Sequence, residues 1–353
     1  MAGTHGKTTT TVMTAESLAA AGRDPTALVG GRVAAWSGNL RGGGDRLYVV
    51  EADEYDRSFL ALSPTVAVVT NIEADHLDIY ADLADIRGAF SEFISGARTI
   101  VLCGEDRGAA GVRLPTGTEV IRYAIADSTG AAAADARLVA RSVRVTGTGG
   151  SFELEFDGDA LGTVTLNVPG RHNILNSLAA LGSGLALGAP AGDLARGLAS
   201  FRGVERRFER VGESRGVTIL DDYAHHPTEI GATLAAARGA FPSKRILVAF
   251  QPHLFSRTRD FARDFATALS AADALYLTEI YPSREQPIPG VTSSLIADRV
   301  AATGGRLAWR GQRSDLAAAL ADGVRDGDVV ILMGAGDITQ TGGELLALLR
   351  MHP

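Results

Sequence analysis

The chain has 353 residues, of which 46% are hydrophobic and 21% charged, and its formal net charge is −7. This composition is ordinary for a folded protein of two or three domains, and an acidic balance without a basic run gives no support to nucleic-acid binding. One cysteine, Cys103, excludes an internal disulfide framework and favours a reducing compartment such as the cytoplasm. No apolar run approaches the ~20 residues of a membrane span.

The first eleven residues predict a phosphate-binding loop followed by a helix over 8–21. In Gly3-Thr4-His5-Gly6-Lys7-Thr8, bare backbone N–H groups can surround phosphate oxygens, and the helix directs its positive end at the same anion. Lys7 would add charge for the β/γ-phosphates, and the Thr8 hydroxyl can ligate Mg²⁺. The alternative is a helix start with a flexible glycine lead-in, but four successive threonines are poor helix formers and favour function. Such a loop normally leaves a buried strand, for which the chain has no room before Gly3.

Strand-like runs alternate with helical stretches along the first 204 residues, which predicts an α/β domain with a parallel sheet. Buried strands are expected at 47–51, 66–71 and 99–102, and helices at 82–96 and 173–187. Three runs separated by glycine-rich turns, 136–145, 151–156 and 161–168, predict an antiparallel meander at the edge of this sheet. The low-complexity stretch 130–135 is expected to be a loop without a chemical role.

A second α/β domain is predicted after a polar linker over 202–216, so that the domains are 1–204 and 205–353. Its strands are expected at 217–220, 245–250, 274–278 and 329–333, with helices between them.

Polar side chains follow most of these strands, where open α/β sheets bind their ligands. Glu51-Ala52-Asp53-Glu54 and then His76 follow two strands whose ends converge, so Glu51 and His76 could share a metal. Two alternatives stay open: a solvated acidic loop, and a structural hydrogen-bonding role for His76, because Mg²⁺ prefers oxygen.

Further clusters lie at a helix start, in the linker and along the second sheet. Asn173 and Asn176 share a helix face and either cap the helix or contact a base. Arg206-Arg207 either binds phosphate or is a solvated basic pair. The run 221–229 gathers two acids and two imidazoles before Pro227, which suits the first position of a helix, and 251–259 and 334–337 add polar groups to the same edge. A coincidental polar loop is the alternative for 221–229.

Nine segments together closely resemble the Mur ligases of peptidoglycan synthesis. They run from residue 2 to about residue 338 and read AGTHGKTTT, EADE, TNIEADHLD, VPGRHNILN, GVERRFE, DDYAHHPTE, FQPHLFSRTRDF, EIYPSREQPIPG and MGAGDI. The most discriminating are DDYAHHPTE and FQPHLFSRT, which resemble the branch of the family that adds L-alanine.

The resemblance implies an ATP- and Mg²⁺-dependent cytoplasmic ligase that joins L-alanine to UDP-N-acetylmuramate through an acyl phosphate, and it leaves a homodimer open. It implies a central ATP-binding domain over 1–204 and a C-terminal Rossmann-like domain over 205–353. The family's N-terminal UDP-sugar domain has no match, so we expect a mis-called start or a truncated gene. We also expect the 353-residue chain to bind ATP–Mg²⁺ weakly and not to ligate alone. A ligase that recycles a cell-wall tripeptide and a non-catalytic nucleotide-binding fragment are the alternatives.

The resemblance also implies roles for individual residues of the first domain. Lys7 would hold the β/γ-phosphates within the loop formed by Gly3, Thr4, His5, Gly6, Thr8 and Thr9. Thr8 and Glu51 would bind one Mg²⁺, and His76 a second. His172 and Asn173 would lie near the γ-phosphate and Asn176 near adenine.

In the second domain, the resemblance implies that Arg207 and Asp222 complete the nucleotide site and that His225 and Arg257 face the alanine. Leu254 stands where some members of the family have arginine, which leaves the amino-acid contacts near it open. This chemistry requires no serine or cysteine nucleophile.

Overall fold

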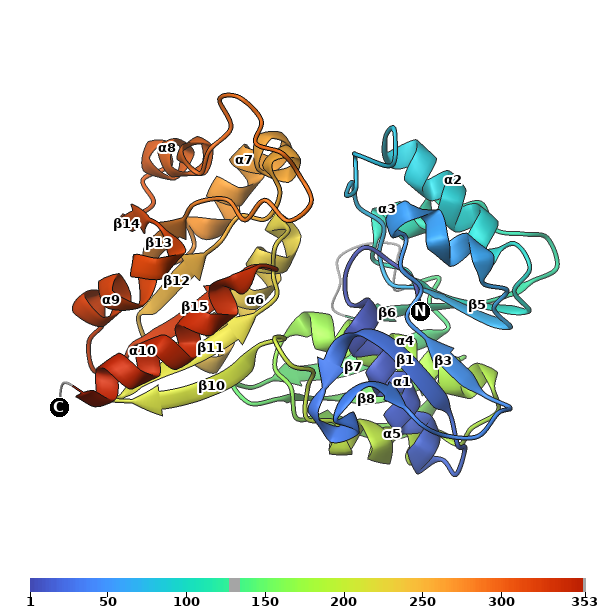
Figure 1. Ribbon diagram of the computed structural model, residues 1–353. Helices are drawn as coiled ribbons and strands as arrows, with labels where there is room; N and C mark the ends of the chain where they lie inside the picture. Colours follow the sequence, from blue (N-terminus) through green and yellow to red (C-terminus); the bar gives the residue numbers. More distant parts are fainter. Residues whose placement is uncertain (127–133, 352–353) are drawn as a thin grey trace. The chain divides into compact units, whose positions relative to one another are not determined.

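The computed structural model describes residues 1–126 and 134–351, and the chain divides into two compact units, Met1–Val204 and Glu205–Pro353 (Figure 1). The stretch 130–135 that the sequence predicts as a loop falls largely outside the described residues. Among the described residues, no helix is both long and apolar enough to cross a membrane.

A six-stranded sheet dominates the first unit. Its first four strands run parallel, and the last two complete an antiparallel meander at one edge, so the predicted parallel sheet with an edge meander is confirmed. The sequence did not reveal β6. In sheet order the strands are β4 (Val66–Val69), β5 (Thr99–Cys103), β6 (Glu119–Ile125), β7 (Leu138–Val145), β8 (Gly150–Phe156) and β9 (Asp159–Leu166).

A separate three-stranded sheet holds the strand predicted at 47–51. β1 (Thr26–Val33) lies in its centre, antiparallel to β2 (Gly38–Arg41) and parallel to β3 (Tyr48–Val50). The prediction that β3 is buried is wrong in part: Val49 is buried but Tyr48 is 61% exposed, because only one face of this small sheet packs on the core. β1 and β2 were missed.

Met1 and Ala2 lie between β3 and β4 and pair with both. The Met1 nitrogen donates to Val50 O (2.8 Å), and Ala52 N donates back to Met1 O (2.8 Å). On the other side Ala2 N donates to Val68 O (2.9 Å), and Thr70 N donates to Ala2 O (3.0 Å). These two residues therefore take the place of a strand before the loop, although no full strand is formed there.

Helices cover both faces of the first unit's main sheet. α1 (Lys7–Ala20) packs against α4 (Arg171–Ala186) and α5 (Ala191–Ser200), and all three contribute to one apolar cluster. The threonines of α1 are buried, and two of their hydroxyls bond backward along the helix: Thr11 Oγ1 donates to Lys7 O (2.8 Å) and Thr14 Oγ1 to Thr10 O (2.7 Å). A second cluster joins α2 and α3 to the opposite side. The remaining helices are η1 (Ala34–Trp36), η2 (Tyr55–Ala61), α2 (Leu83–Ile94) and α3 (Arg107–Ala110).

The second unit is a Rossmann-like α/β sandwich around a six-stranded sheet, as predicted. β10 is antiparallel to β11, and the other neighbours run parallel. Four central strands are buried along nearly their whole length, which their continuous apolar sequences predict. In sheet order the strands are β10 (Glu209–Ser214), β11 (Val217–Asp222), β15 (Val329–Met333), β12 (Ile246–Phe250), β13 (Ala274–Thr278) and β14 (Leu307–Gly311).

The predicted linker over 202–216 is too long, because β10 occupies its second half. Arg215 and Gly216, with φ of 52° and 70°, form a two-residue hairpin loop that returns the chain into β11. The sequence reads as polar there because β10 is an edge strand with no fully buried residue.

Helices cover this sheet on both faces (Figure 1). One apolar cluster contains side chains from α6 (Pro227–Ala240), α7 (Phe255–Leu269) and α8 (Ser294–Ala302). The other contains side chains from α9 (Arg313–Gly323) and α10 (Gln340–Met351), with η3 (Asp337–Thr339) leading into α10.

Candidate functional site

The loop before α1 requires glycine at two positions. Gly3 has a φ of 140° and Gly6 a φ of 80°, which side chains rarely adopt. A Cβ on Gly3 would lie 2.0 Å from Thr70 Oγ1, and one on Gly6 would lie 2.5 Å from Asn176 Oδ1. The loop is therefore curled by its glycines and closely walled by neighbouring side chains.

Residues that follow β4 fix the conformation of this loop. Asn71 accepts from His5 N on its Oδ1 (2.7 Å) and donates from Nδ2 to His5 O (3.0 Å). Thr70 Oγ1 also donates to His5 O (2.7 Å), and Glu73 N donates to Thr4 Oγ1 (2.9 Å). The end of β4 thus holds the loop before any ligand binds.

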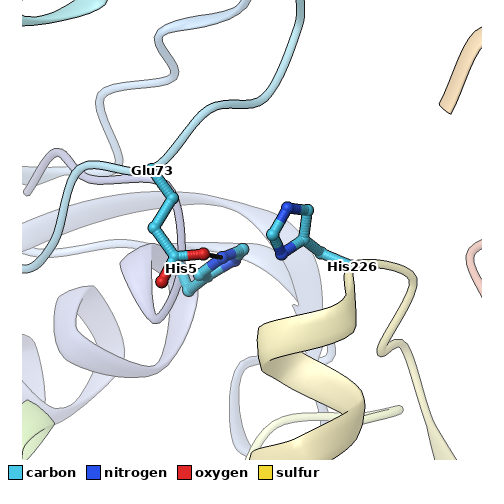
Figure 2. Close-up of side chains that lie close together, drawn as sticks. All are labelled: His5, Glu73 and His226. Atoms are coloured by element: carbon cyan, nitrogen blue, oxygen red, sulfur yellow. Dashed lines mark hydrogen bonds and ion pairs between the residues drawn. The ribbon is translucent and has the colours of Figure 1, made fainter. Parts of the chain in front are cut away.

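The His5 ring lies against the same segment, with Nε2 3.4 Å from Glu73 Oε2. Figure 2 shows this pair and also draws His226 of the second unit.

Both ends of the acidic segment Glu51–Glu54, which follows β3, contact the start of α1. Lys7 Nζ donates to Glu54 Oε2 (2.7 Å) and lies 3.6 Å from Asp53 Oδ1. Thr8 Oγ1 donates to Glu51 Oε1 (2.9 Å). Burial lowers the pKa of Lys7, but the carboxylates of Glu54 and Asp53 outweigh it and leave that pKa raised. Lys7 is therefore protonated and fixed in position at the helix start, as a phosphate-binding lysine must be.

A set of carboxylate and imidazole groups lies beside Lys7. Ligand atoms of Asp53, Glu54 and His76 all lie within 4.8 Å of one another. Glu54 is 3% exposed, and within the described part of the chain its Oε1 has no hydrogen-bond partner, although His76 Nε2 is 3.9 Å away. A buried carboxylate oxygen without a hydrogen bond suits a hard divalent cation such as Mg²⁺. The sequence paired His76 with Glu51, whereas the structure brings Glu54 to His76.

The amides of α4 form the wall opposite the loop. Asn176 Oδ1 accepts from Thr10 Oγ1 (3.3 Å), and Asn176 Nδ2 donates to Asn173 Oδ1 (3.3 Å). Both asparagines are buried, and neither caps α4, whose N-cap is Gly170. The capping interpretation is therefore wrong, and Asn176 lies directly against Gly6. His172 is half-buried on the first turn of the same helix.

In the second unit, Asp222 ends β11 as a buried carboxylate. Its Oδ2 accepts from Phe208 N and its Oδ1 from Ala224 N, both at 2.8 Å. Burial raises the pKa of Asp222 to about 6, against the opposing effect of the Arg207 guanidinium. This group therefore titrates close to neutral pH.

Two arginines stack on Tyr223, the residue after Asp222. The guanidinium carbons of Arg206 and Arg207 lie 4.9 and 5.0 Å from the centre of its ring. Arg206 also donates to Gly334 O (2.6 Å), and Arg207 lies 3.7 Å from Glu229 Oε1. Tyr223 thereby orients Arg207 from the end of β11.

The start of α6 is a capping box, as Pro227 predicts. Thr228 N donates to His226 Nδ1 (3.4 Å), while Glu229 Oε2 accepts from His226 N (3.3 Å) and His225 N (3.0 Å). His226 therefore has a structural role at this helix end.

His225 and Arg257 are brought to the same edge of the second sheet. The His225 ring centre is 5.9 Å from that of His253, and Arg257 Nη1 is 3.3 Å from His253 Nδ1. Tyr281 stacks on His253 at 5.9 Å and accepts from Leu254 N on its backbone oxygen (3.0 Å). Tyr281 was not predicted as a site residue; the one signal for it is the segment EIYPSREQPIPG that contains it.

Models of known protein families match both units. The Mur ligase middle domain matches residues 1–184, which is more than half of the chain, and the glutamate ligase domain of Mur ligases matches residues 206–336. The chain belongs to the Mur ligase family. The family resemblance of the sequence is thereby confirmed.

Similar Mur ligases include enzymes named for the addition of L-alanine. The UDP-N-acetylmuramate–L-alanine ligase of Solidesulfovibrio magneticus is 45% identical over 350 residues, which are 98% of this chain and 75% of that protein. The corresponding ligase of Mycobacterium ulcerans is 44% identical over 99% of this chain and 72% of its own length.

Solved Mur ligases share the fold. The crystal structure of the UDP-N-acetylmuramate–alanine ligase of Thermotoga maritima matches with a TM-score of 0.81 at 28% identity, over 99% of this chain and 75% of that one. A murein peptide ligase from Psychrobacter arcticus matches with a TM-score of 0.70 at 23% identity, over 98% and 76% of the two chains, a likeness of fold alone.

Proposed function

We propose that this Mur ligase joins L-alanine to the carboxylate of UDP-N-acetylmuramate, with cleavage of ATP to ADP and phosphate. The γ-phosphoryl group passes to the carboxylate oxygen. The alanine amine then attacks the acyl carbon, phosphate leaves, and the amine loses a proton. The observation that carries the proposal is a glycine loop, with Lys7 at a helix start, in a chain 45% identical to a ligase of that name.

The first unit supplies the proposed nucleotide grip. The loop N–H groups from Gly3 to Thr9 and the Lys7 ammonium would hold the β/γ-phosphates, with His172 and Asn173 near the γ-phosphate and Asn176 near adenine. Support comes from Asn176, which lies close to Gly6, and from Lys7, which pairs with the carboxylates of Asp53 and Glu54 that a phosphate can replace.

The same unit offers a donor set that fits Mg²⁺. Thr8 and Glu51 would hold one ion and His76 a second, to which the geometry adds Glu54 through its unbonded Oε1. Bound Mg²⁺ neutralises charge on the phosphates during transfer. In the absence of the ions, Lys7 balances part of the negative charge of these carboxylates through its ion pair with Glu54.

The second unit supplies the groups that we propose to complete the phosphate site and to contact the alanine. Arg207 would bind phosphate oxygens, oriented by Tyr223 and balanced by Asp222. His225 and Arg257 would face the alanine, with Arg257 suited to its carboxylate. Leu254 is buried beside them and adds no charge. We further propose a cytoplasmic reaction, in keeping with the single buried thiol of Cys103.

The test is phosphate release with ATP, Mg²⁺, UDP-N-acetylmuramate and one amino acid at a time. It is run on the 353-residue chain and on the chain with any upstream coding sequence of the same frame included. From the form that includes the upstream sequence we expect release with L-alanine and little with D-glutamate or meso-diaminopimelate. Preference for a preformed tripeptide would move the proposal to the recycling ligase. ATP binding without release in either form would favour the nucleotide-binding fragment.

A further inference from the structure

A cavity of about 450 Å³ opens in the second unit at the amino ends of its parallel strands. It lies between the start of β13, the residues before β14 and the end of α9. Because the central strands are five residues long, this edge is about 16 Å from the carboxyl ends that carry His225 and Asp222. The cavity is thus separate from the proposed ligase site.

Three arginines line this cavity, and they differ in their partners. Arg245 is held by Asp328, with Nε 2.9 Å from Oδ1, and donates to Gly323 O (2.9 Å). For Arg306 and Arg325, no side-chain hydrogen bond or ion pair is found within residues 1–126 and 134–351. Two guanidinium groups therefore remain available to a ligand.

The cavity also has a tyrosine hydroxyl and one acid whose carboxylate, among the described residues, has no hydrogen bond or ion pair. Tyr276 is buried, and its Oη would lie 1.9 Å from a Cβ on Gly323, so the missing side chain there admits the hydroxyl. Asp322 is exposed on the last turn of α9 and also lines the cavity. Gly323 O, at the negative end of α9, is already bonded by Arg245, which reduces its repulsion of an anion.

We infer that this cavity binds a small organic phosphate that carries hydroxyl groups, such as a sugar phosphate. Arg306 and Arg325 hold the phosphate through charge-assisted hydrogen bonds, and Asp322 accepts from a hydroxyl of the organic part. A phosphate alone gains nothing from Asp322 and is repelled by it. Leu307, Ala308 and Val324 provide the apolar wall that the organic part contacts. The inference does not depend on the proposed ligase activity.

The test is calorimetric titration of the 353-residue chain with ribose 5-phosphate and with inorganic phosphate. Both are measured in a Lys7→Ala background, so that the phosphate loop contributes as little as possible. We expect ribose 5-phosphate to bind more tightly than phosphate. The pair Arg306→Gln with Arg325→Gln should weaken it about tenfold or more, since two charge-assisted contacts are lost. The matched control, Arg263→Gln with Arg350→Gln, removes the same charge from exposed helix positions and should leave affinity unchanged.

Asp322→Asn should change the affinities for the two probes in opposite directions, which distinguishes binding of the phosphate from binding of the hydroxyl-bearing part. It should strengthen binding of inorganic phosphate, because a like charge is removed, and weaken binding of ribose 5-phosphate relative to phosphate. Arg306, Arg325, Asp322, Arg263 and Arg350 are all exposed, so their substitution should leave the Lys7→Ala protein folded. Equal affinity in the double-arginine variant and its control, or no heat with either probe, would overturn the inference.

Discussion

The polar sites at the strand ends of the two units are built in different ways. In the first unit the backbone builds the site: Gly3 and Gly6 curl the loop, and Asn71 and Thr70 fix it through backbone partners. In the second unit side chains build the site, among them the buried Asp222 and the half-buried Tyr223. One region depends on conformations that only glycine tolerates, and the other on charges that burial makes sensitive to pH.

Non-glycine residues with positive φ occur in both units. His76, in the first site, has a φ of 51°, and in the second unit Arg206, Phe208, Arg215 and Leu254 have values from 52° to 72°. Such conformations cost about 1–3 kcal/mol each, so they persist where surrounding contacts hold them. The stacking of Arg206 on Tyr223 and its bond to Gly334 O are contacts of this kind.

The largest expected effect follows from Lys7→Ala. The variant should lose more than about tenfold in ATP turnover, because a cation at the developing charge contributes several kcal/mol in the transition state. Turnover is measured as phosphate release in the alanine-dependent assay, on the form that includes any upstream coding sequence of the same frame. Lys244→Ala, at the chain's other lysine, is the control and should keep full activity.

Removal of Lys7 also leaves Glu54 buried without its ion pair, which lowers stability. Combining Lys7→Ala with Glu54→Gln should restore the melting temperature but not the turnover. Turnover above a tenth of the wild-type value in a folded Lys7→Ala protein would show that Lys7 is not the phosphate lysine.

The next effect is a pH dependence of stability from Asp222. Its pKa is raised from 3.8 to about 6 in the folded protein, so the folded state binds this proton more tightly than the unfolded chain. The stabilisation is complete below pH 3.8 and is lost as the pH rises through about 6. A shift of this size corresponds to about 3 kcal/mol.

Asp222→Asn should remove this decline, so the free energy of unfolding of the variant rises relative to the wild type between those pH values. Urea unfolding at a series of pH values measures it. The exposed Asp298→Asn serves as the control. A parallel pH profile for wild type and Asp222→Asn would contradict the assignment and weaken the contrast between the two regions.

A smaller effect tests the glycine loop. Gly6→Ala should lower the free energy of unfolding by about 2 kcal/mol, through positive φ and a clash with Asn176, and should abolish ATP binding. Gly22→Ala is matched in φ, at 73°, but meets nothing within 4 Å. It should cost about 1 kcal/mol and leave ATP binding intact. Equal losses of stability and of ATP binding in the two variants would show that the close contact of Asn176 with Gly6 does not determine the loop conformation.

The smallest effect concerns strain in the second unit. Arg215→Asn should raise the free energy of unfolding by up to about 1 kcal/mol, because asparagine tolerates the positive φ of this hairpin position. Arg263→Asn removes the same charge from α7, where no such strain exists, and should lower stability slightly through helix propensity. A destabilised Arg215→Asn protein would mean that the Arg215 side chain contributes more than its backbone costs.

The sequence predicted the parts of the fold that have strong local signals. The buried strands β5, β12, β13 and β15 were predicted from continuous apolar runs, and α6 from Pro227. β1 was missed because Gly30 and Gly31 interrupt it, and β14 because it is an edge strand that is only half-buried. The polar composition of β10 was mistaken for a linker.

Contacts among the candidate site residues follow from the sequence where the residues share a short motif, and do not where a partner lies elsewhere in the chain. The loop from Gly3 to Thr8 and its contact with Glu51 follow from local spacing and strand order. The choice of Glu54 beside His76 depends on how two strand ends meet, which spacing does not specify. Asn71 and Tyr281 act through contacts distant in sequence, so no local pattern singles them out.

The two residues that join β3 to β4 couple ligand binding to the cooperativity of the first unit. Four backbone hydrogen bonds at Met1 and Ala2 hold the small sheet to the large one, and the loop starts at the next residue. We call Met1, Ala2 and their four hydrogen bonds the seam. Local opening of the seam would separate the Glu51–Glu54 segment from the Thr70–His76 segment at the same moment. A ligand that bridges both segments therefore stabilises the seam by mass action. Amide hydrogen exchange at Ala2, Ala52 and Thr70 should then slow as ligand concentration rises, so the seam reports occupancy of the loop from within the sheet.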